Sequence, residues 1–226
     1  MSSFWDTYVD LVGVHKENEQ LRKEVDRLKT RLVFLNARSA SADRLRRLLD
    51  FTPQEGWQRS GARVVAHDYA SFGAVESIII DKGKFQGFKT DMPVVTPEGV
   101  VGRTFKTGLN FSSVLILTDP NSRIPVISSM TRVPGIIAGQ GCGKPLSMQY
   151  VHLNSPLQEG EMLVTSGLAG IYPKGIPVAE VTDIHRSEIS LFLMVEAFPL
   201  VSVKSSEEVL VLKKDDTLSR QTFLEE

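Results

Sequence analysis

The sequence contains very little cysteine and histidine, the residues on which disulfide frameworks and most structural metal sites depend. Cys142 is the only cysteine among 226 residues, so no intramolecular disulfide and no cysteine-based metal site can form. No two of the four histidines have the spacing of a zinc site. They are His15, His67, His152 and His185. The composition therefore predicts neither a metal centre nor a cofactor.

The chain also lacks a strong net charge and any long apolar run. A formal net charge of -1 argues against a nucleic-acid partner held by bulk electrostatics. The charge is uneven, since residues 14–50 carry ten Lys/Arg against six Asp/Glu and residues 51–226 carry sixteen against nineteen. We interpret the basic excess as the solvated flank of a helix. No segment approaches the roughly 18 apolar residues that span a bilayer, and no signal peptide is visible.

Aromatic residues are unusually dense at the start of the chain. Phe4, Trp5 and Tyr8 are three aromatics within five positions. Aromatic side chains gather at membrane interfaces beside spanning helices. Two interpretations stay open: the sequence begins just after a membrane anchor, or these residues only extend the helix that follows.

Residues Leu11–Leu35 carry a strict heptad pattern, with spacings that alternate between three and four. The a positions are Leu11, Asn18, Val25 and Leu32, and the d positions are Val14, Leu21, Leu28 and Leu35. A stripe this narrow suits a seam against another helix better than the covered face of a globular core. We predict a coiled-coil helix over residues 4–50.

The residues of this seam favour a parallel dimer. Leucine at d with valine or asparagine at a is typical of two parallel strands, and Asn18 would fix their register. Glu17 would then face Arg22 of the partner helix. Glu24 would face Lys29 in the same way, and such exposed pairs contribute only about 0–1 kcal/mol each, so they select orientation. The alternative is one amphipathic helix packed on its own domain, but no second helix is predicted that could partner it.

The residue pattern changes after Pro53 and Gly56, which end the helix. From there to Lys214, short β-branched runs alternate with Gly, Pro, Asn and Asp, which is typical of an all-β fold. The predicted strands are Ala62–His67, Ala74–Ile80, Met92–Thr96, Gly99–Thr104, Ser113–Leu117, Arg123–Ile127, Val133–Ala138, Leu146–His152, Met162–Thr165, Gly175–Ile184, Leu191–Ala197 and Glu207–Leu212.

A dozen short strands suit two small β-barrels. The predicted fold is thus mainly β, with a long N-terminal α-helix that forms a coiled coil ahead of two small barrels. We place the first barrel in residues 60–95 plus 186–213 and the second in residues 96–185, followed by a flexible tail over 214–226.

The apolar run Leu191–Val195 is interpreted as a strand buried on both faces rather than as part of a partner groove. A partner could also add a strand to an exposed barrel edge.

One set of residues supports an enzymatic hypothesis. His67, then Asp81 or Asp119, then Ser166 follow the His–Asp–Ser order of chymotrypsin-like proteases, which are double β-barrels. However, Ser166 lies in Val-Thr-Ser-Gly-Leu and lacks the Gly-Asp-Ser-Gly turn that forms the oxyanion hole in that family. We therefore predict no catalytic residue and interpret Ser166 as a turn residue. A serine hydrolase is kept as an alternative hypothesis, and a cytosolic coiled-coil adaptor as another.

A glycine-rich stretch, Gly135–Lys144, ends in Gly-Lys in the manner of a phosphate-binding loop. Pro145 follows where such a loop needs Ser or Thr and the start of a helix. The run Leu146–His152 is strand-like instead. The stretch therefore predicts a β-hairpin, not a nucleotide site.

An ordered set of short motifs over residues 8–213 resembles the MreC family of bacterial rod shape-determining proteins. The motifs are Tyr8–Leu11, Glu17–Leu21, Asp81-Lys82-Gly83 with Gly87, Met92–Val95, Gly99–Gly102, Ser113–Asp119, Gly135–Gly139, Thr165-Ser166-Gly167 and Pro173–Val178. Two positions depart from the family pattern: Glu161 stands where Asp is more usual, and Ala179 where Gly is common.

The resemblance implies a non-enzymatic scaffold that organises peptidoglycan synthesis and maintains rod cell shape. Members of the family carry an N-terminal membrane helix, a coiled coil and two small β-barrels outside the cytoplasmic membrane. The implied partners are a second copy of the chain, a class B penicillin-binding protein (the elongation transpeptidase), the membrane protein MreD and the actin-like cytoskeleton. The implied location is periplasmic, with anchorage to the inner membrane by a helix that this sequence does not contain.

Overall fold

The computed structural model describes the backbone of residues 3–69, 75–141, 143–186 and 190–215. Side chains are described for Glu19 and for residues 21–68, 77–141, 143–186 and 190–215. The chain divides into two compact units, residues 1–47 and 48–226. Cys142, His15 and the end of the predicted tail beyond Asp215 lie outside the described side chains.

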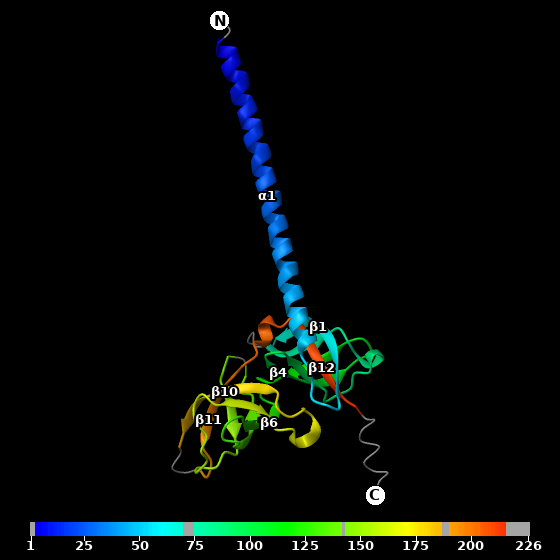
Figure 1. Ribbon diagram of the computed structural model, residues 1–226, viewed down its shortest axis with the longest axis vertical. Helices are drawn as coiled ribbons and strands as arrows, with labels where there is room; N and C mark the ends of the chain where they lie inside the picture. The colour runs from blue at the N-terminus through cyan, green and yellow to red at the C-terminus, as the bar shows by residue number, and fades with distance from the viewer. Residues whose placement is uncertain (1–2, 70–74, 142, 187–189, 216–226) are drawn as a thin grey trace. The chain divides into compact units, whose positions relative to one another are not determined.

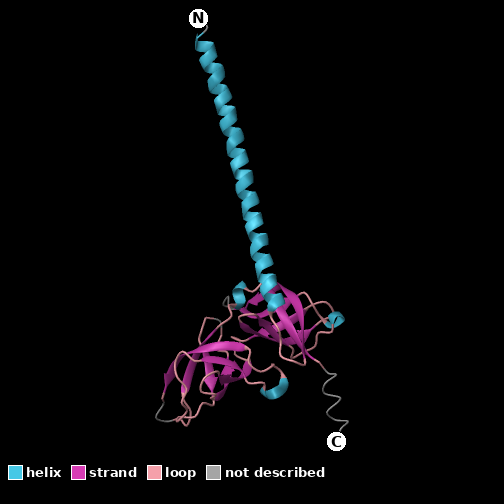
Figure 2. Cartoon of the chain, viewed as in Figure 1, coloured by secondary structure: helices cyan, strands magenta, loops and turns pink. Residues whose placement is uncertain are grey.

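The first unit is formed by helix α1 (Ser3–Asp50), which begins within one residue of the predicted start and ends at the predicted residue. Figure 2 shows it as one unbroken helix. No glycine or proline after Gly13 interrupts it until Pro53, where the next segment begins. In the described part of the chain, no helix combines the length and the apolar character that crossing a bilayer requires.

The second unit contains two closed six-stranded barrels. Figure 1 shows β1, β4 and β12 together in the first barrel and β6, β10 and β11 together in the second. The first barrel consists of β1 (Trp57–Tyr69), β2 (Val75–Ile80), β3 (Pro93–Thr96), β4 (Gly99–Thr107), β5 (Ser112–Ile116) and β12 (Glu208–Lys214). The second consists of β6 (Arg123–Ser128), β7 (Pro134–Ala138), β8 (Leu146–Gln149), β9 (Met162–Thr165), β10 (Pro177–His185) and β11 (Met194–Pro199). Each predicted strand overlaps one of these.

The predicted division of the strands between the barrels is wrong in two places. β4 and β5 belong to the first barrel, although residues 96–185 were assigned to the second, and β11 belongs to the second, although residues 186–213 were assigned to the first. Antiparallel hairpins keep β3, β4 and β5 in one sheet. Only β12 returns to the first barrel, where it pairs with both β1 and β3 and closes the sheet.

Alternation of buried and exposed side chains lets each sheet enclose its own core. In β5 and β9 every second side chain is buried, as expected for a strand with one face inside a barrel. Shifts of register interrupt several pairs, for example between Val64 and Ala66 on β1 and between Val181 and Asp183 on β10. Such irregularities bend strands, which allows so few strands to close.

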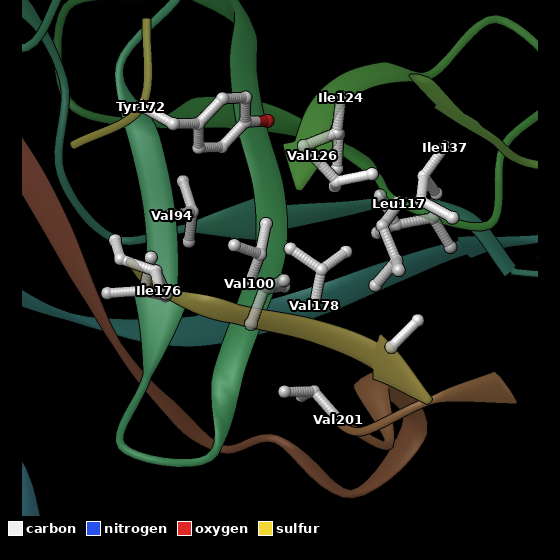
Figure 3. Packing of buried hydrophobic residues seen from close by; sticks show 14 of the residues in the cluster. Val94, Val100, Leu117, Ile124, Val126, Ile137, Tyr172, Ile176, Val178 and Val201 are labelled. Carbon is white, nitrogen blue, oxygen red and sulfur yellow. The ribbon is translucent and has the colours of Figure 1, made fainter. Parts of the chain in front are cut away.

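The cores of the two barrels are joined into one apolar cluster. Figure 3 shows Val94 and Val100 of the first barrel near Ile176 and Val178 of the second. Gly99, at the start of β4, is essential to this contact because a Cβ there would lie 2.5 Å from the carbonyl oxygen of Pro177. The Leu200 N–H donates a hydrogen bond to the Val178 carbonyl at 3.2 Å, next to Val201, which is buried in the same cluster.

Tyr172 strengthens this junction from the loop before β10. Its side chain is almost completely buried, and burial raises the pKa of its hydroxyl above the ordinary value. Arg103 and Asp91 of the first barrel form an ion pair close enough to influence this hydroxyl electrostatically. The two barrels are therefore held by a packed interface with a polar margin, not by a linker alone.

Candidate functional site

The seam residues of α1 are exposed wherever their side chains are described. The exposed fractions are 55% for Leu21, 46% for Val25, 53% for Leu28, 58% for Leu32 and 53% for Leu35. Leu11, Val14, Asn18 and the charged Glu17 lie outside the described side chains. A stripe of half-exposed leucines and valines on an isolated helix is a surface available to another helix. The dimer itself remains a prediction.

The predicted inter-helix charge pairs involve residues on the flanks of this stripe. Arg22, Glu24 and Lys29 are exposed on α1, one position to either side of the a and d residues. These are the e and g positions that face a second helix in a coiled coil. Their pairing across a dimer likewise remains a prediction.

An open groove of about 620 Å³ lies on the outside of the second barrel. Its walls are the paired strands β8 and β11, with residues of β7 and the loop after it. Tyr150 and Met194 line it with about 60% of each side chain exposed. The polar and charged residues of the lining are Arg123, Gln140, Ser147, Gln149, His185 and Glu196. Of the lining residues, the aromatic, methionine and arginine side chains are of the types enriched at protein interfaces.

Phe192 anchors the aromatic side of this groove. Its ring contacts Tyr150 edge-on, with centroids 5.9 Å apart, and His152 at 5.5 Å. A β-bridge between His152 and Phe192 fixes the two backbones opposite each other. Tyr150 has a φ of 65°, which is uncommon for a bulky side chain and directs attention to this site. Three aromatic rings are thus held in a defined arrangement at the protein surface.

The interpretation of Leu191–Val195 as a strand buried on both faces is wrong. Leu193 and Val195 are buried, but Leu191 is 78% exposed and Met194 is 60% exposed. A barrel wall has only one face toward its core, so half of these apolar side chains point outward. Of this segment, Phe192, Leu193, Met194 and Val195 line the groove, and Leu191 does not.

The residues of the hypothetical triad have local structural surroundings. Asp81 accepts a hydrogen bond from the Arg63 N–H at 2.8 Å and forms an ion pair with its guanidinium. Asp119 accepts the Asn121 N–H at 2.7 Å within a turn. Ser166 follows β9, and its hydroxyl accepts the Leu168 N–H at 3.2 Å, as expected for a turn residue. These contacts give each of the three residues a turn or ion-pair role.

A buried carboxylate, that of Glu161, occupies the second barrel, although the sequence marks this position only as a departure from the family pattern. Glu161 is 3% exposed, and it accepts hydrogen bonds from the hydroxyls of Ser128 and Thr131 and from the N–H groups of Thr131 and Gln158. Burial raises the pKa of this carboxyl, but the hydrogen bonds together outweigh it, so the pKa lies below its ordinary value. Every described contact of the carboxylate serves to join turns, which indicates a structural role.

The glycine-rich stretch and His185 have structural surroundings in the second barrel. The glycine-rich stretch forms the β7–β8 hairpin, as predicted. His185 pairs with Asp183 at 2.9 Å on the exposed end of β10. In the described residues no group of three His, Cys, Asp or Glu side chains is arranged to hold a metal ion.

Comparison with known proteins identifies the family. Residues 64–213 match the model for the rod shape-determining protein MreC, barrel core. The chain belongs to the MreC family. The cell shape-determining protein MreC of Haemophilus influenzae is 31% identical over 207 residues, which are 92% of this chain and 58% of that protein. The chain thus spans less than two thirds of the length of this MreC relative.

Solved MreC structures agree with the fold. One, described as MreC, has a TM-score of 0.71 and 29% identity, covering 78% of this chain and 99% of that one. Another is the MreC in a complex between the penicillin-binding protein PBP2 and MreC from Helicobacter pylori, with a TM-score of 0.57, 16% identity and coverage of 70% and 98%. The second shows a likeness of fold alone. The predicted fold class, mainly β with one N-terminal helix and two small barrels, is confirmed.

Proposed function

We propose that this MreC-family chain is a non-enzymatic scaffold of the machinery that elongates the cell wall. In this role α1 joins two copies in parallel, and the barrels present docking surfaces to enzymes of peptidoglycan synthesis. The observation that carries the proposal is the heptad stripe of α1, whose described members are each about half exposed. Its leucines and valines need a second helix to become buried.

The proposed partner of the groove on the second barrel is a class B penicillin-binding protein. The Helicobacter pylori MreC, which shares the fold, was solved in a complex with PBP2. The groove supplies the features of a protein-binding centre, namely exposed Tyr150 and Met194 beside the fixed ring of Phe192. Closed barrels have no free strand edge, so the predicted addition of a strand is replaced by binding to side chains.

The proposed location is periplasmic, with anchorage to the inner membrane by a segment outside this sequence. A solved MreC with the same fold is described as the major periplasmic domain of a cell shape-determining filament. MreD and the actin-like cytoskeleton are proposed partners by family resemblance only. A stalk in the form of a coiled coil would hold paired barrels in register outside the membrane.

The dimer is tested by charge substitutions on two faces of the same helix. Leu21→Asp with Leu28→Asp should convert the dimer into a monomer in sedimentation velocity, because charges at a d position disrupt the seam. The matched control is Val33→Asp with Phe34→Asp, which changes two side chains that are each 68% exposed but lie off the seam. The control should stay dimeric. Equal behaviour of the two double variants would exclude the seam as the interface.

Binding of the penicillin-binding protein is tested on the groove alone. Tyr150→Ala with Met194→Ala should weaken binding to the extracytoplasmic domain of a class B penicillin-binding protein by roughly 30-fold or more, as measured by calorimetry. Leu168→Ala is the control, since Leu168 is 63% exposed on the same barrel and does not line the groove. Unchanged affinity of the double variant would reject this groove as the docking surface.

A further inference from the structure

The first barrel presents a group of large apolar side chains that neither the seam nor the groove includes. Phe85 is 72% exposed, Leu109 is 61% exposed and Phe111 is 53% exposed. Phe85 belongs to the short 3-10 helix η1 (Lys84–Gln86), and the other two belong to the β4–β5 turn. We call these three residues the apolar tip. Exposed apolar groups of this kind mark interaction sites more often than isolated ones do.

The backbone holds the apolar tip rigidly. The N–H groups of Lys84 and Phe85 donate hydrogen bonds to the carbonyls of Gly108 and Leu109, at 2.9 and 3.1 Å. Gly83 permits this close approach, because a Cβ there would lie 2.6 Å from both carbonyl oxygens. These hydrogen bonds join two segments of the chain, so the backbone of the tip is fixed before any partner binds, which lowers the entropic cost of binding.

Two phenylalanines in the segment that carries Phe85 have opposite environments, one buried and one exposed. Phe88 is 3% exposed and packs in the barrel core, whereas Phe85, three residues earlier, points to solvent. Burial of Phe88 fixes the segment on the barrel. Stability therefore does not account for a phenylalanine at position 85.

The two chain segments that form the apolar tip carry lysines and no acidic residue. Residues 82–89 and 104–112 contain Lys82, Lys84, Lys89 and Lys106 and no Asp or Glu. Lys84, Lys89 and Lys106 are exposed, and Lys106 also lies over the Phe105 ring at 5.5 Å. Asp81, which adjoins the first segment, is already paired with Arg63.

We propose that the apolar tip is a separate docking site for a partner protein with an acidic surface around an apolar pocket. Three side chains of this size offer roughly 300–400 Å², whereas one side of a stable interface usually buries about 800 Å². The interface must therefore extend over the surrounding lysines, and only an acidic partner gains from facing them. A second copy of the tip carries the same positive charge and is repelled.

Photo-crosslinking in the native bacterium tests the proposal with the full-length protein. Leu109 is replaced by benzoylphenylalanine, and Leu168, equally exposed on the second barrel, is replaced in a control. Position 109 should form a protein adduct whose crosslinked segment, mapped by mass spectrometry, has an excess of Asp and Glu. Lys84→Glu with Lys106→Glu should reduce the adduct by about tenfold, and Lys144→Glu on the second barrel should not.

The decisive test is whether a charge reversal on the partner compensates for the charge reversal on this protein. Replacement of the mapped partner carboxylates by lysine should restore the adduct in the Lys84→Glu, Lys106→Glu variant. The proposal is overturned if position 109 forms no adduct, if it crosslinks to lipid or to a second copy of the chain, or if reversal of the lysines has no effect. Thermal unfolding of the variants must match that of the original protein, which is expected because both lysines are exposed.

Discussion

Helix α1 and the barrels contain the same apolar residue types but bury them to very different extents. The described seam leucines of α1 are 53–58% exposed, whereas Leu146, Leu163 and Leu212 in the barrels are fully buried. A closed sheet encloses its own interior, while a single helix has no opposing wall. We expect barrel stability to be a property of one chain and burial of the seam to be a property of two.

The largest effect is expected from a truncation inside a barrel. Leu146→Ala should lower the free energy of unfolding by about 2–5 kcal/mol, because a fully buried leucine leaves a cavity. Urea unfolding measures this loss, which should not depend on protein concentration. Leu168→Ala, at a 63% exposed position, should change the free energy by less than about 0.5 kcal/mol.

Glu161 should make the stability of the second barrel sensitive to acid. Glu161→Gln should cost about 1.5–3 kcal/mol at pH 7, because it weakens several hydrogen bonds to a buried charge. The folded pKa of the carboxyl lies below its unfolded value, so its stabilisation is complete above the unfolded pKa of about 4.5 and is lost as the pH falls through the folded pKa.

The measurement for Glu161 is thermal unfolding as a function of pH. The difference between the original protein and the Gln variant should be constant at neutral pH and shrink below about pH 4.5. Glu159→Gln, on an exposed neighbour, is the control and should have little effect at any pH. A difference that grows on acidification would contradict the assignment.

A smaller effect is expected where the two barrels meet. Gly99→Ala should destabilise the protein by about 1–3 kcal/mol, since the added Cβ meets the Pro177 carbonyl oxygen and the φ of 150° disfavours a side chain. Differential scanning calorimetry would show a lower melting temperature. Gly61→Ala on β1 is the control, because a Cβ there has no neighbour within 4 Å; equal effects at both positions would argue against a steric cause.

The smallest effect on the barrels is expected from the seam. Leu28→Ala makes the same chemical change as Leu146→Ala, but at a half-exposed position, and should alter barrel unfolding by less than about 0.5 kcal/mol. It should instead weaken dimer formation, which sedimentation equilibrium detects as a concentration-dependent mass. A loss of barrel stability comparable to that of Leu146→Ala would mean that the two regions do not bury their residues independently.

The helix and the strands of this protein could be predicted from the sequence, but the way the strands pair into barrels could not. Each of the twelve strands was predicted because alternation and turn residues act over a few positions. The pairing of β12 with β1 and β3 joins residues more than a hundred positions apart, and no local pattern specifies it. The division between the barrels was therefore wrong even though the strands were correct.

The same limit applies to the three candidate binding surfaces: the seam follows a local pattern, whereas the groove and the apolar tip depend on contacts between distant residues. The seam repeats along one helix, so its periodicity can be read directly from α1. The groove depends on Tyr150 and Phe192, which meet only because β8 pairs with β11. The apolar tip likewise depends on the hydrogen bonds that the Lys84 and Phe85 N–H groups donate to the carbonyls of Gly108 and Leu109.

The sequence alone determined the long helix, the strands and the heptad pattern, since each of these rests on short-range order along the chain. It also indicated the family, through the order of short motifs over residues 8–213. The tertiary structure decided which strands share a barrel, which half of Leu191–Val195 is exposed and which apolar side chains gather at the surface. Those features depend on contacts between distant residues, and such contacts exist only after both barrels have closed.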